Sequence, residues 1–254
     1  MRRFRNDRTP GTLHAHRRGP ALVGLAAWAL DGRHGDDGFM PAWLTVDLFK
    51  AARGMPTVVS TRLVRDGRRV RNSECELVQD GRPVVRATLV QYRRSSAPKG
   101  EEWRSAMDFP RPDVDDTRYT RIGSDKGLVR RDRRHQNASR KRFMNRSVDV
   151  VAGQRNGPFV DAAMVAEGTS LVTNLGSAGV GYINGDLTVG FARLPCDEWI
   201  GVQADSHWAQ DGIAVGTATL FDSVGPFGSG MVTAVSNPAA QIDFTDDPFP
   251  SRTR

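Results

Sequence analysis

The sequence predicts an α+β fold built from two similar halves, each with one central helix against a curved antiparallel sheet. The first observation behind this prediction is an order of landmarks that occurs twice: a Gly-Pro pair, an apolar segment, a Leu-Thr-Val triplet, and two turn signals between strand-like runs. The second is that equivalent landmarks lie 138 to 145 residues apart, so the halves differ only by short insertions. A repeat of this kind is typical of a duplicated domain.

The first half begins with a segment that has no polar face. Residues 20–30 read PALVGLAAWAL, with Pro20 suited to the first helical position and Gly32 to the end of the helix. A helix that is apolar all round must be covered on most sides. We therefore expect a curved sheet to wrap around it.

Strand-like runs follow this helix. They alternate or are rich in β-branched residues, and they cover 57–64, 68–79 and 83–94. Asp66-Gly67 and Asp80-Gly81 lie at the junctions, and Asp-Gly between such runs is a strong hairpin signal. The first half is therefore predicted as a helix, a strand and then an antiparallel meander.

The second half repeats this order. We expect a helix over 159–172, a Gly-rich loop over 174–185, and strands over 186–193, 198–209, 212–221 and 227–236. The second helix differs from the first because it carries the polar residues Asp161, Glu167, Thr169 and Ser170. The second copy therefore has polar groups to place where the first has none.

The predicted domain boundaries follow the breaks in this pattern. Two domains cover 1–93 and 141–240, with a charge-dense connection over 94–140 and a flexible tail over 241–254. Residues 1–18 are expected to be poorly ordered or to form at most one short strand. The basic cluster within the connection is open to two interpretations, a solvated linker or a phosphate-contacting loop near a ligand.

The composition argues against a nucleic-acid partner, although the formal net charge is +7. Only four of the 36 Lys and Arg residues are lysines, which fits a codon bias better than a phosphate-binding patch. No helix-turn-helix, zinc-finger or RNA-binding signature accompanies them. No apolar stretch approaches the ~20 residues that span a bilayer. We therefore expect neither a nucleic-acid partner nor a membrane span.

The cysteines and the N-terminus favour a cytoplasmic protein. Cys75 and Cys196 have no metal-ligand spacing, and Cys75 lies in an alternating strand pattern as a small core residue. Arg17-Arg18 before an apolar run imitates a twin-arginine signal peptide. The equivalent apolar segment lies deep in the second half, where no signal peptide can be, so both segments are interpreted as structural helices.

Comparison of the two halves identifies a candidate catalytic carboxylate. Asp186, directly before the second Leu-Thr-Val triplet, aligns with Trp43, so only one half carries the acid. In a cleft between domains this carboxylate could orient or deprotonate a water for attack on an acyl carbon. The alternative is that residues 184–186 form a turn in which Asp serves the backbone.

Other candidates surround this position. Ser206 and His207 lie on the next strand, at a distance where they could face Asp186 across the sheet. The helix starts at Pro20 and Pro158 could supply amides for an oxyanion. Three further residues near the helices are candidates for substrate binding, namely His16, Gly19 and Gly168. No metal ligand set is recognised, and no cofactor is expected.

Two segments resemble the halves of a known family. Residues 44–91 and 183–228 are similar to the double-hotdog acyl-CoA thioesterases, of the thioesterase II type and its actinobacterial relatives. The likeness covers most of 14–235 and is most specific in the paired "LTV…DG…DG" framework and in the strand that begins at Glu198 and Trp199. The resemblance implies a tandem hotdog fold.

The resemblance also implies an activity and a site. The activity is hydrolysis of fatty acyl-CoA to the fatty acid and CoA, in lipid metabolism and without metal or organic cofactor. A water is held by an Asp, a Thr or Ser, and a Gln. Asp186 matches the Asp, and Ser206 or His207 matches the hydroxyl position. The Gln position falls on Val232 or Thr233, where no Gln is present, and Thr233 could substitute in part.

The missing Gln leaves a second function open, a double-hotdog protein that binds acyl-CoA or a fatty acid without hydrolysing it. The resemblance further implies a homo-oligomer formed through the sheets. The N-terminus departs from the family, because His16-Arg17-Arg18-Gly19 stands where a full strand and an "HGG"-like approach usually precede the first helix. We therefore expect that a strand could be lacking there.

Overall fold

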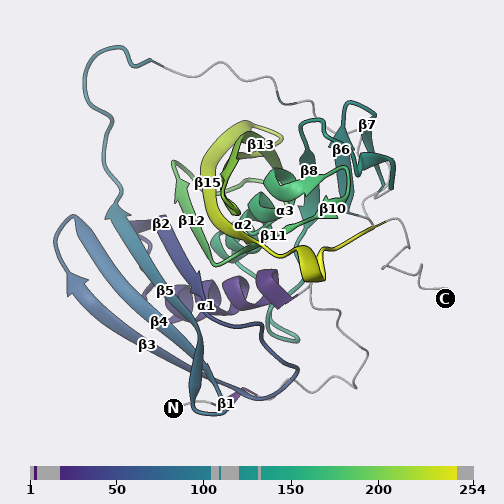
Figure 1. Ribbon diagram of the computed structural model, residues 1–254. Helices are drawn as coiled ribbons and strands as arrows, with labels where there is room; N and C mark the ends of the chain where they lie inside the picture. The colour runs from purple at the N-terminus through teal and green to yellow at the C-terminus, as the bar shows by residue number, and fades with distance from the viewer. Residues whose placement is uncertain (1–2, 5–17, 104–108, 110–119, 131–132, 245–254) are drawn as a thin grey trace.

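The computed structural model describes residues 3–4, 18–103, 109, 120–130 and 133–244 (Figure 1). The elements of the first half are β1 (Arg3–Phe4), α1 (Arg18–His34), β2 (Phe39–Leu48), β3 (Thr57–Asp66), β4 (Val70–Gln79) and β5 (Arg82–Arg93). The predicted helix, strand and meander are confirmed. The helix extends two residues beyond Gly32, and nothing lies within 4 Å of that exposed position to obstruct it.

The second half is longer and has two helices. Its elements are β6 (Arg121–Ser124), β7 (Gly127–Arg130), η2 (Arg133–His135), β8 (Arg142–Arg146), α2 (Pro158–Ala166), α3 (Gly168–Asn174), β9 (Leu175–Gly176), β10 (Gly179–Val180), β11 (Tyr182–Asn184), β12 (Asp186–Phe191), β13 (Trp199–Gln210), β14 (Ile213–Asp222), β15 (Gly225–Ser236) and η3 (Pro238–Ala240). The single helix predicted over 159–172 is divided at Glu167. Glycine and β-branched or hydroxyl residues follow this position and have low helix propensity.

The two halves share one sheet. Its strand order is β1-β3-β4-β5-β2-β12-β15-β14-β13-β8-β6-β7, and β11 pairs with β15 outside this path. At the junction, β2 and β12 are antiparallel and Thr45 lies opposite Thr188. The two Leu-Thr-Val triplets therefore pair with each other, and the duplicated sequence supplies both sides of the junction.

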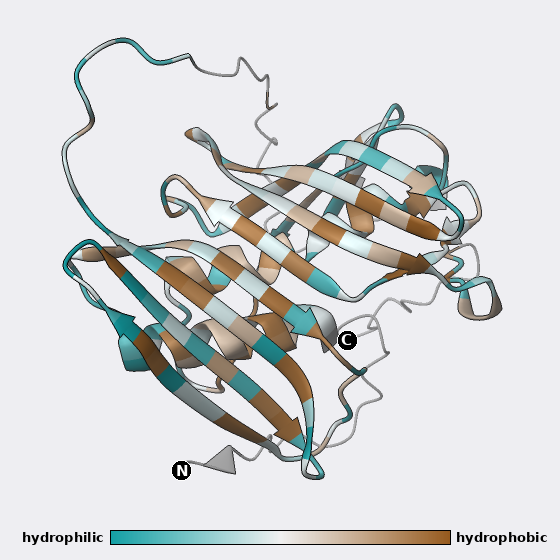
Figure 2. Ribbon diagram, turned by 60° about the vertical axis from the view of Figure 1, so that its left-hand side comes forward, coloured by the Kyte–Doolittle hydropathy of each residue, from teal (hydrophilic) through white to brown (hydrophobic). Residues whose placement is uncertain are grey.

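The helices cover one face of this sheet, which we call the inner face (Figure 1). Leu44, Val46, Leu187 and Val189 are almost completely buried in the core that the helices share. Because side chains alternate along a strand, the residues between them point to the opposite, outer face. Figure 2 shows the strands of the first half in front of α1. This is the tandem hotdog arrangement that the sequence predicts.

Helices α1 and α2 pack side by side and run in opposite directions. The start of α1, at Gly19, lies against Glu167 at the end of α2. Gly24 lies against Met164, and Asp31 near the end of α1 lies close to Gly157, which precedes α2. Each helix start therefore meets the end of the other helix.

Part of the predicted connection belongs to the second domain. Within 94–140, β6 and β7 form a hairpin, and β6 pairs with β8, which pairs with β13. The hairpin thus joins the sheet of the second half ahead of the predicted boundary at residue 141. The hairpin strands have only four residues each in a charge-dense stretch, so alternation over so short a length gives little signal.

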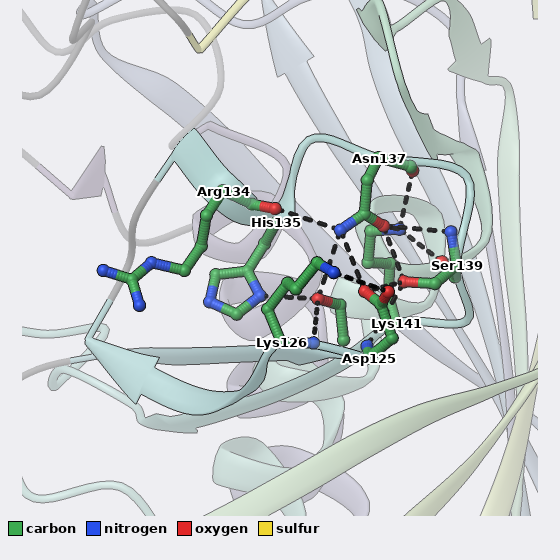
Figure 3. Close-up of polar contacts among 8 residues, drawn as sticks. Asp125, Lys126, Arg134, His135, Asn137, Ser139 and Lys141 are labelled. Atoms are coloured by element: carbon green, nitrogen blue, oxygen red, sulfur yellow. Dashed lines mark hydrogen bonds and ion pairs between the residues drawn. The ribbon is translucent and has the colours of Figure 1, made fainter.

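A buried lysine holds the loop between this hairpin and β8 (Figure 3). The ammonium of Lys141 donates to the carbonyl of Asn137 at 2.8 Å, to its side-chain oxygen at 2.9 Å, and to the carbonyl of Ser139. Asp125 accepts from Ser139 and from Asn137. Burial lowers the pKa of Lys141, and the nearby Asp125 charge opposes this shift. This lysine is therefore directed into the fold and not toward a phosphate on the surface.

The ends of the chain differ in part from the expected tails. Arg3 and Phe4 pair with Val58 and Thr57, which is the one short strand that the sequence allows. At the other end, Ile242 pairs with Val180 and belongs to a small apolar cluster, so the packed part of the chain continues beyond 240. Residues 5–17 and 245–254 lie outside the described residues. Among the described helices, none is long and apolar enough to cross a membrane.

The crossing of α1 and α2 can be tested at Gly24. A Cβ at this position would lie 2.5 Å from Cγ of Met164 and 2.8 Å from Cγ2 of Val150. We expect Gly24→Ala to lower the free energy of unfolding by about 1–3 kcal/mol through overpacking. Gly32→Ala is the control, because a Cβ there has no neighbour within 4 Å. It should raise stability by about 0.5–1 kcal/mol through helix propensity. Urea unfolding measures both, and equal effects would contradict the close crossing.

Candidate active site

A carboxylate lies where the two halves meet. Glu167 occupies the break between α2 and α3, where its backbone keeps helical angles of −62° and −23°. Its side chain reaches the first turn of α1, and a Cβ added to Gly19 would overlap its Oε1. Only glycine at that position admits the carboxylate to the start of the facing helix.

The next residue, Gly168, packs closely against two strands of the second half. A Cβ on Gly168 would lie 3.0 Å from Cδ1 of Phe143 and 3.8 Å from Cγ2 of Val202. Strands β8 and β13 therefore approach the helix break closely. Of the two glycines predicted to contact substrate, Gly19 lies against the Glu167 carboxylate, and Gly168 directly follows Glu167 in the chain.

Burial changes the acidity of this carboxyl group. Desolvation raises the pKa of Glu167 from 4.5 to about 8. Among the described residues, no hydrogen-bond donor or cation is recorded on the carboxylate to oppose this. The residue as a whole is nevertheless only partly buried. A carboxyl group with so strongly shifted a pKa, at a domain junction, is a candidate for proton transfer.

The start of α1 adds hydrogen-bond donors to the same place. The first four amides of any α-helix lack partners within the helix, and their dipoles favour negative charge nearby. Pro20 has no amide hydrogen, so the donors beside Glu167 come from residues such as Gly19 and Ala21. The site thus combines one proton acceptor with a set of backbone donors.

The opposite end of the helix pair holds a second carboxylate. Oδ2 of Asp31 lies 3.8 Å from the Cβ position of Gly157, at the start of α2. Burial raises the pKa of Asp31 as well. The helix pair therefore places an acid beside the start of each helix. The pKa of Glu167 is raised more than that of Asp31.

Asp186, the acid predicted from the sequence, lies on the outer face. Its neighbour Leu187 is fully buried on the inner face, so Asp186 points away from the helices. Its Oδ1 accepts from the amide of Thr233 at 2.7 Å, and its Oδ2 accepts from the Thr233 hydroxyl. The predicted partner Thr233 is thus present, and both residues join the start of β12 to β15.

The other two predicted catalytic residues lie on different faces. Ser206 forms a hydrogen bond of 2.7 Å with Thr217 on the outer face. His207 lies opposite Gly216, on the helix side, with its exposed ring 5.9 Å from that of Tyr182. A β-bulge between Ala204 and Ser206 sets this register. Asp186 and Thr233 are therefore in contact, whereas no contact joins Ser206 or His207 to Asp186 among the described interactions.

Two sequence-based candidates remain to be placed. His16 lies outside the described residues. Pro158 begins α2, and the acid beside it is Asp31, as described above. In the part of the chain that the structure describes, no three His, Cys, Asp or Glu side chains gather to hold a metal ion.

Sequence reasoning identified Glu167 only as one of four polar residues on the second helix. A sharper signal was present, because Glu167 directly follows the buried apolar run 162–166 and directly precedes Gly168. Burying an unpaired carboxylate is costly, so an acid at such a position indicates either a paired group or a functional one. The position of Gly19 against it could not be found from spacing alone.

Two family models match the chain. The model of the acyl-CoA thioesterase N-terminal domain matches residues 9–92. The model of the acyl-CoA thioesterase C-terminal domain matches residues 94–231. Together they span most of the chain, and the division between them falls next to the predicted end of the first domain. A search of curated proteins gave no match.

Solved structures share the fold. A tesB protein of Mycobacterium avium subspecies paratuberculosis has a TM-score of 0.65 at 15% identity, over 93% of each chain. Acyl-CoA thioesterase II TesB2 of Mycobacterium marinum has a TM-score of 0.62 at 20% identity, over 89% of each chain. A hot dog fold protein of Alicyclobacillus acidocaldarius has a TM-score of 0.59 at 16% identity, over 88% of each chain.

At these identities the structural likeness establishes the fold alone, and the two family models carry the assignment. They cover both halves in the order in which the structure arranges them. The chain belongs to the acyl-CoA thioesterase family and is a thioester hydrolase.

Proposed function

We propose that this protein hydrolyses fatty acyl-CoA to the free fatty acid and CoA, with a water activated by Glu167. The observation that carries the proposal is the position of this carboxyl group, which is desolvated and lies against the first turn of α1. The acyl-CoA substrate is supported by family membership.

The chemistry assigns one role to each group. Glu167 accepts a proton from the water as its oxygen attacks the thioester carbonyl carbon. The negative charge that develops on the carbonyl oxygen is stabilised by the backbone amides at the start of α1. The carbon–sulfur bond then breaks, and the leaving thiolate takes the proton back from Glu167. A carboxyl pKa of about 8 suits this return, because it is close to the ~8.5 of an ordinary thiol.

Asp186 remains the competing prediction for the water-activating acid. Two observations favour Glu167 over it. Asp186 lies on the outer face, and both of its carboxylate oxygens already accept hydrogen bonds from Thr233. Glu167 faces the helix junction and has no recorded donor among the described residues. The alternative function, binding without hydrolysis, would require that neither acid supports turnover.

Substitution of each acid in turn compares Glu167 and Asp186 directly. We expect Glu167→Gln to lower kcat for acyl-CoA hydrolysis by roughly 10²–10⁴-fold, because the amide cannot accept the proton. The matched variant Asp186→Asn keeps a hydrogen-bond acceptor for Thr233 and should stay within a few-fold of wild type. Thiol release from medium-chain and long-chain acyl-CoA, followed with a thiol-reactive dye, measures both variants.

The outcomes of this comparison separate the assignments. Loss of activity in Asp186→Asn with normal turnover in Glu167→Gln would establish Asp186 as the water-activating acid and exclude Glu167. No turnover in purified wild type, together with measurable acyl-CoA binding, would favour the non-hydrolysing alternative. Circular dichroism spectra of both variants check that neither change disturbs the fold.

The raised pKa of Glu167 predicts how the rate depends on pH. The base form is required, so kcat/KM should rise about tenfold per pH unit below a midpoint near 8 and level off above it. Asp186→Asn should keep the same midpoint. A profile that is already flat above pH 5 would show that an ordinary carboxylate, and not Glu167, is the base.

The same ionisation predicts a dependence of stability on pH. Folding raises the pKa of Glu167, so the folded state holds the proton more tightly between pH 4.5 and about 8. The stability that comes from this tighter proton binding is fully present below pH 4.5, and it is lost as the pH rises through the folded-state pKa of about 8. Urea unfolding should show this loss in wild type and a flatter pH dependence in Glu167→Gln.

Gly19 provides a test that leaves the carboxyl group in place. The Cβ of Gly19→Ala would overlap Oε1 of Glu167 and must push the carboxylate away from the start of α1. We expect kcat/KM to fall at least tenfold, because proton acceptor and oxyanion donors are no longer aligned. Stability should change little, since the overlapping atom ends a flexible side chain. Gly32→Ala, in the same helix, is the control and should keep full activity.

A further inference from the structure

The first half contains a buried polar site that the proposed reaction does not use. It consists of His34, Ser73 and Gln91, below the last turn of α1. Ser73 is 0% and Gln91 1% exposed. Within the described residues, Nε2 of His34, Oγ of Ser73 and both amide atoms of Gln91 are buried without a hydrogen-bond partner.

Pairing in the sheet places Ser73 and Gln91 on the same face, and a contact of Arg71 brings the end of α1 near them. Gln91 on β5 lies directly opposite Arg71 on β4, and Ser73 is two residues further along β4, on the same inner face. Arg71 donates to the carbonyl oxygen of His34 at 3.4 Å, which brings the end of α1 over this part of the sheet. Three elements therefore contribute to one site.

The neighbouring charges do not supply the missing partners. The Arg71 guanidinium is bound by Asp66 at 2.9 Å and by Asp36 at 3.6 Å, and it lies over the ring of Phe39. The pKa of His34 is lowered by burial and by the charges of Arg33 and Arg71, so its ring is neutral at pH 7. The unpartnered atoms are thus all neutral, and they include both donors and acceptors.

The second half fills the equivalent place differently. The offset of 143 residues between the Leu-Thr-Val triplets relates Ser73 to Gly216 and Gln91 to Ala234. The sheet pairings agree, because Ser73 lies opposite Leu89 as Gly216 lies opposite Val232. In the second half Thr173 of α3 fills the space above Gly216. The pair of Ser73 and Gln91 at these two positions is therefore particular to the first half.

A buried amide with neither donor nor acceptor satisfied opposes folding, and native proteins pair almost all such groups. Internal water molecules usually make about three hydrogen bonds to buried polar groups that the protein does not pair itself. An anion would need a free cation and a metal ion would need carboxylates, whereas this site offers a neutral amide, hydroxyl and imidazole. Water matches this set of donors and acceptors.

We propose that His34, Ser73 and Gln91 form a binding site for one or two internal water molecules, which belong to the folded core of the first half. The water bridges the end of α1 to β4 and β5 through these three side chains. It takes the place that a side chain of the helix fills in the second half. The site lies at the opposite end of α1 from Glu167, so it acts on stability and not on catalysis.

The test replaces Gln91 with the apolar side chain of similar length. We expect Gln91→Met to lower Tm by about 2–8 °C, because it removes two hydrogen bonds to water. Gln79→Met is the matched control, since Gln79 is also buried and its amide bonds directly to Arg53 and Thr57. It should lower Tm by a similar amount. Acyl-CoA hydrolysis by Gln91→Met should match wild type.

Magnetic relaxation dispersion of water ¹⁷O counts long-lived internal waters and separates the two variants. Gln91→Met should lose at least one such water relative to wild type, and Gln79→Met should lose none. A rise in Tm of Gln91→Met, or an unchanged water count, would overturn the proposal, because a dry site gains stability when an unpaired amide is removed. If Gln91→Met does not fold, Ser73→Ala is measured in the same way and should also lose a water.

Discussion

The antiparallel pairing of β2 with β12 is the contact on which the rest of the structure depends. Because Thr45 lies opposite Thr188, the two halves are related by an approximate twofold axis through this junction. The same relation lays α1 and α2 side by side in opposite directions. The start of α1 must then meet the end of α2, which is where Glu167 lies. The position of the site thus follows from how the duplicated strands pair.

The chemical difference between the two acids follows from their surroundings. A carboxylate that accepts hydrogen bonds is stabilised in its charged form, whereas a desolvated one is destabilised and becomes a better base. Asp186 belongs to the first kind, because Thr233 donates to both of its oxygens. Glu167 belongs to the second, since protein surrounds it and no donor is recorded among the described residues. The stability lost by burying Glu167 is consistent with a role in proton transfer.

The sequence predicted the fold well because its signals are local. The apolar segment of α1, the Asp-Gly turns and the repeated triplet each indicate one element, and the repeat orders them. The site depends on tertiary contacts, such as the approach of Gly19 to Glu167, for which spacing has no signal. The face of a strand is also sensitive to register, because a shift of one residue reverses it. Asp186 could be assigned to a strand start but not to a face.

The two halves have the same arrangement of strands, but they differ in the side chains on the inner face. On the inner face of the second half, Gly216 and Ala234 are small, and Thr173 packs into the space. On the inner face of the first half, Ser73 and Gln91 are polar, and His34 at the end of α1 also has a buried nitrogen without a partner among the described residues. The acids differ in the same way, with Glu167 held at the helix break and Asp31 near a helix end. Ser73 and Gln91 lie at the opposite end of α1 from Glu167, so the polar groups that we propose to bind water are separated from the carboxylate that we propose as the base.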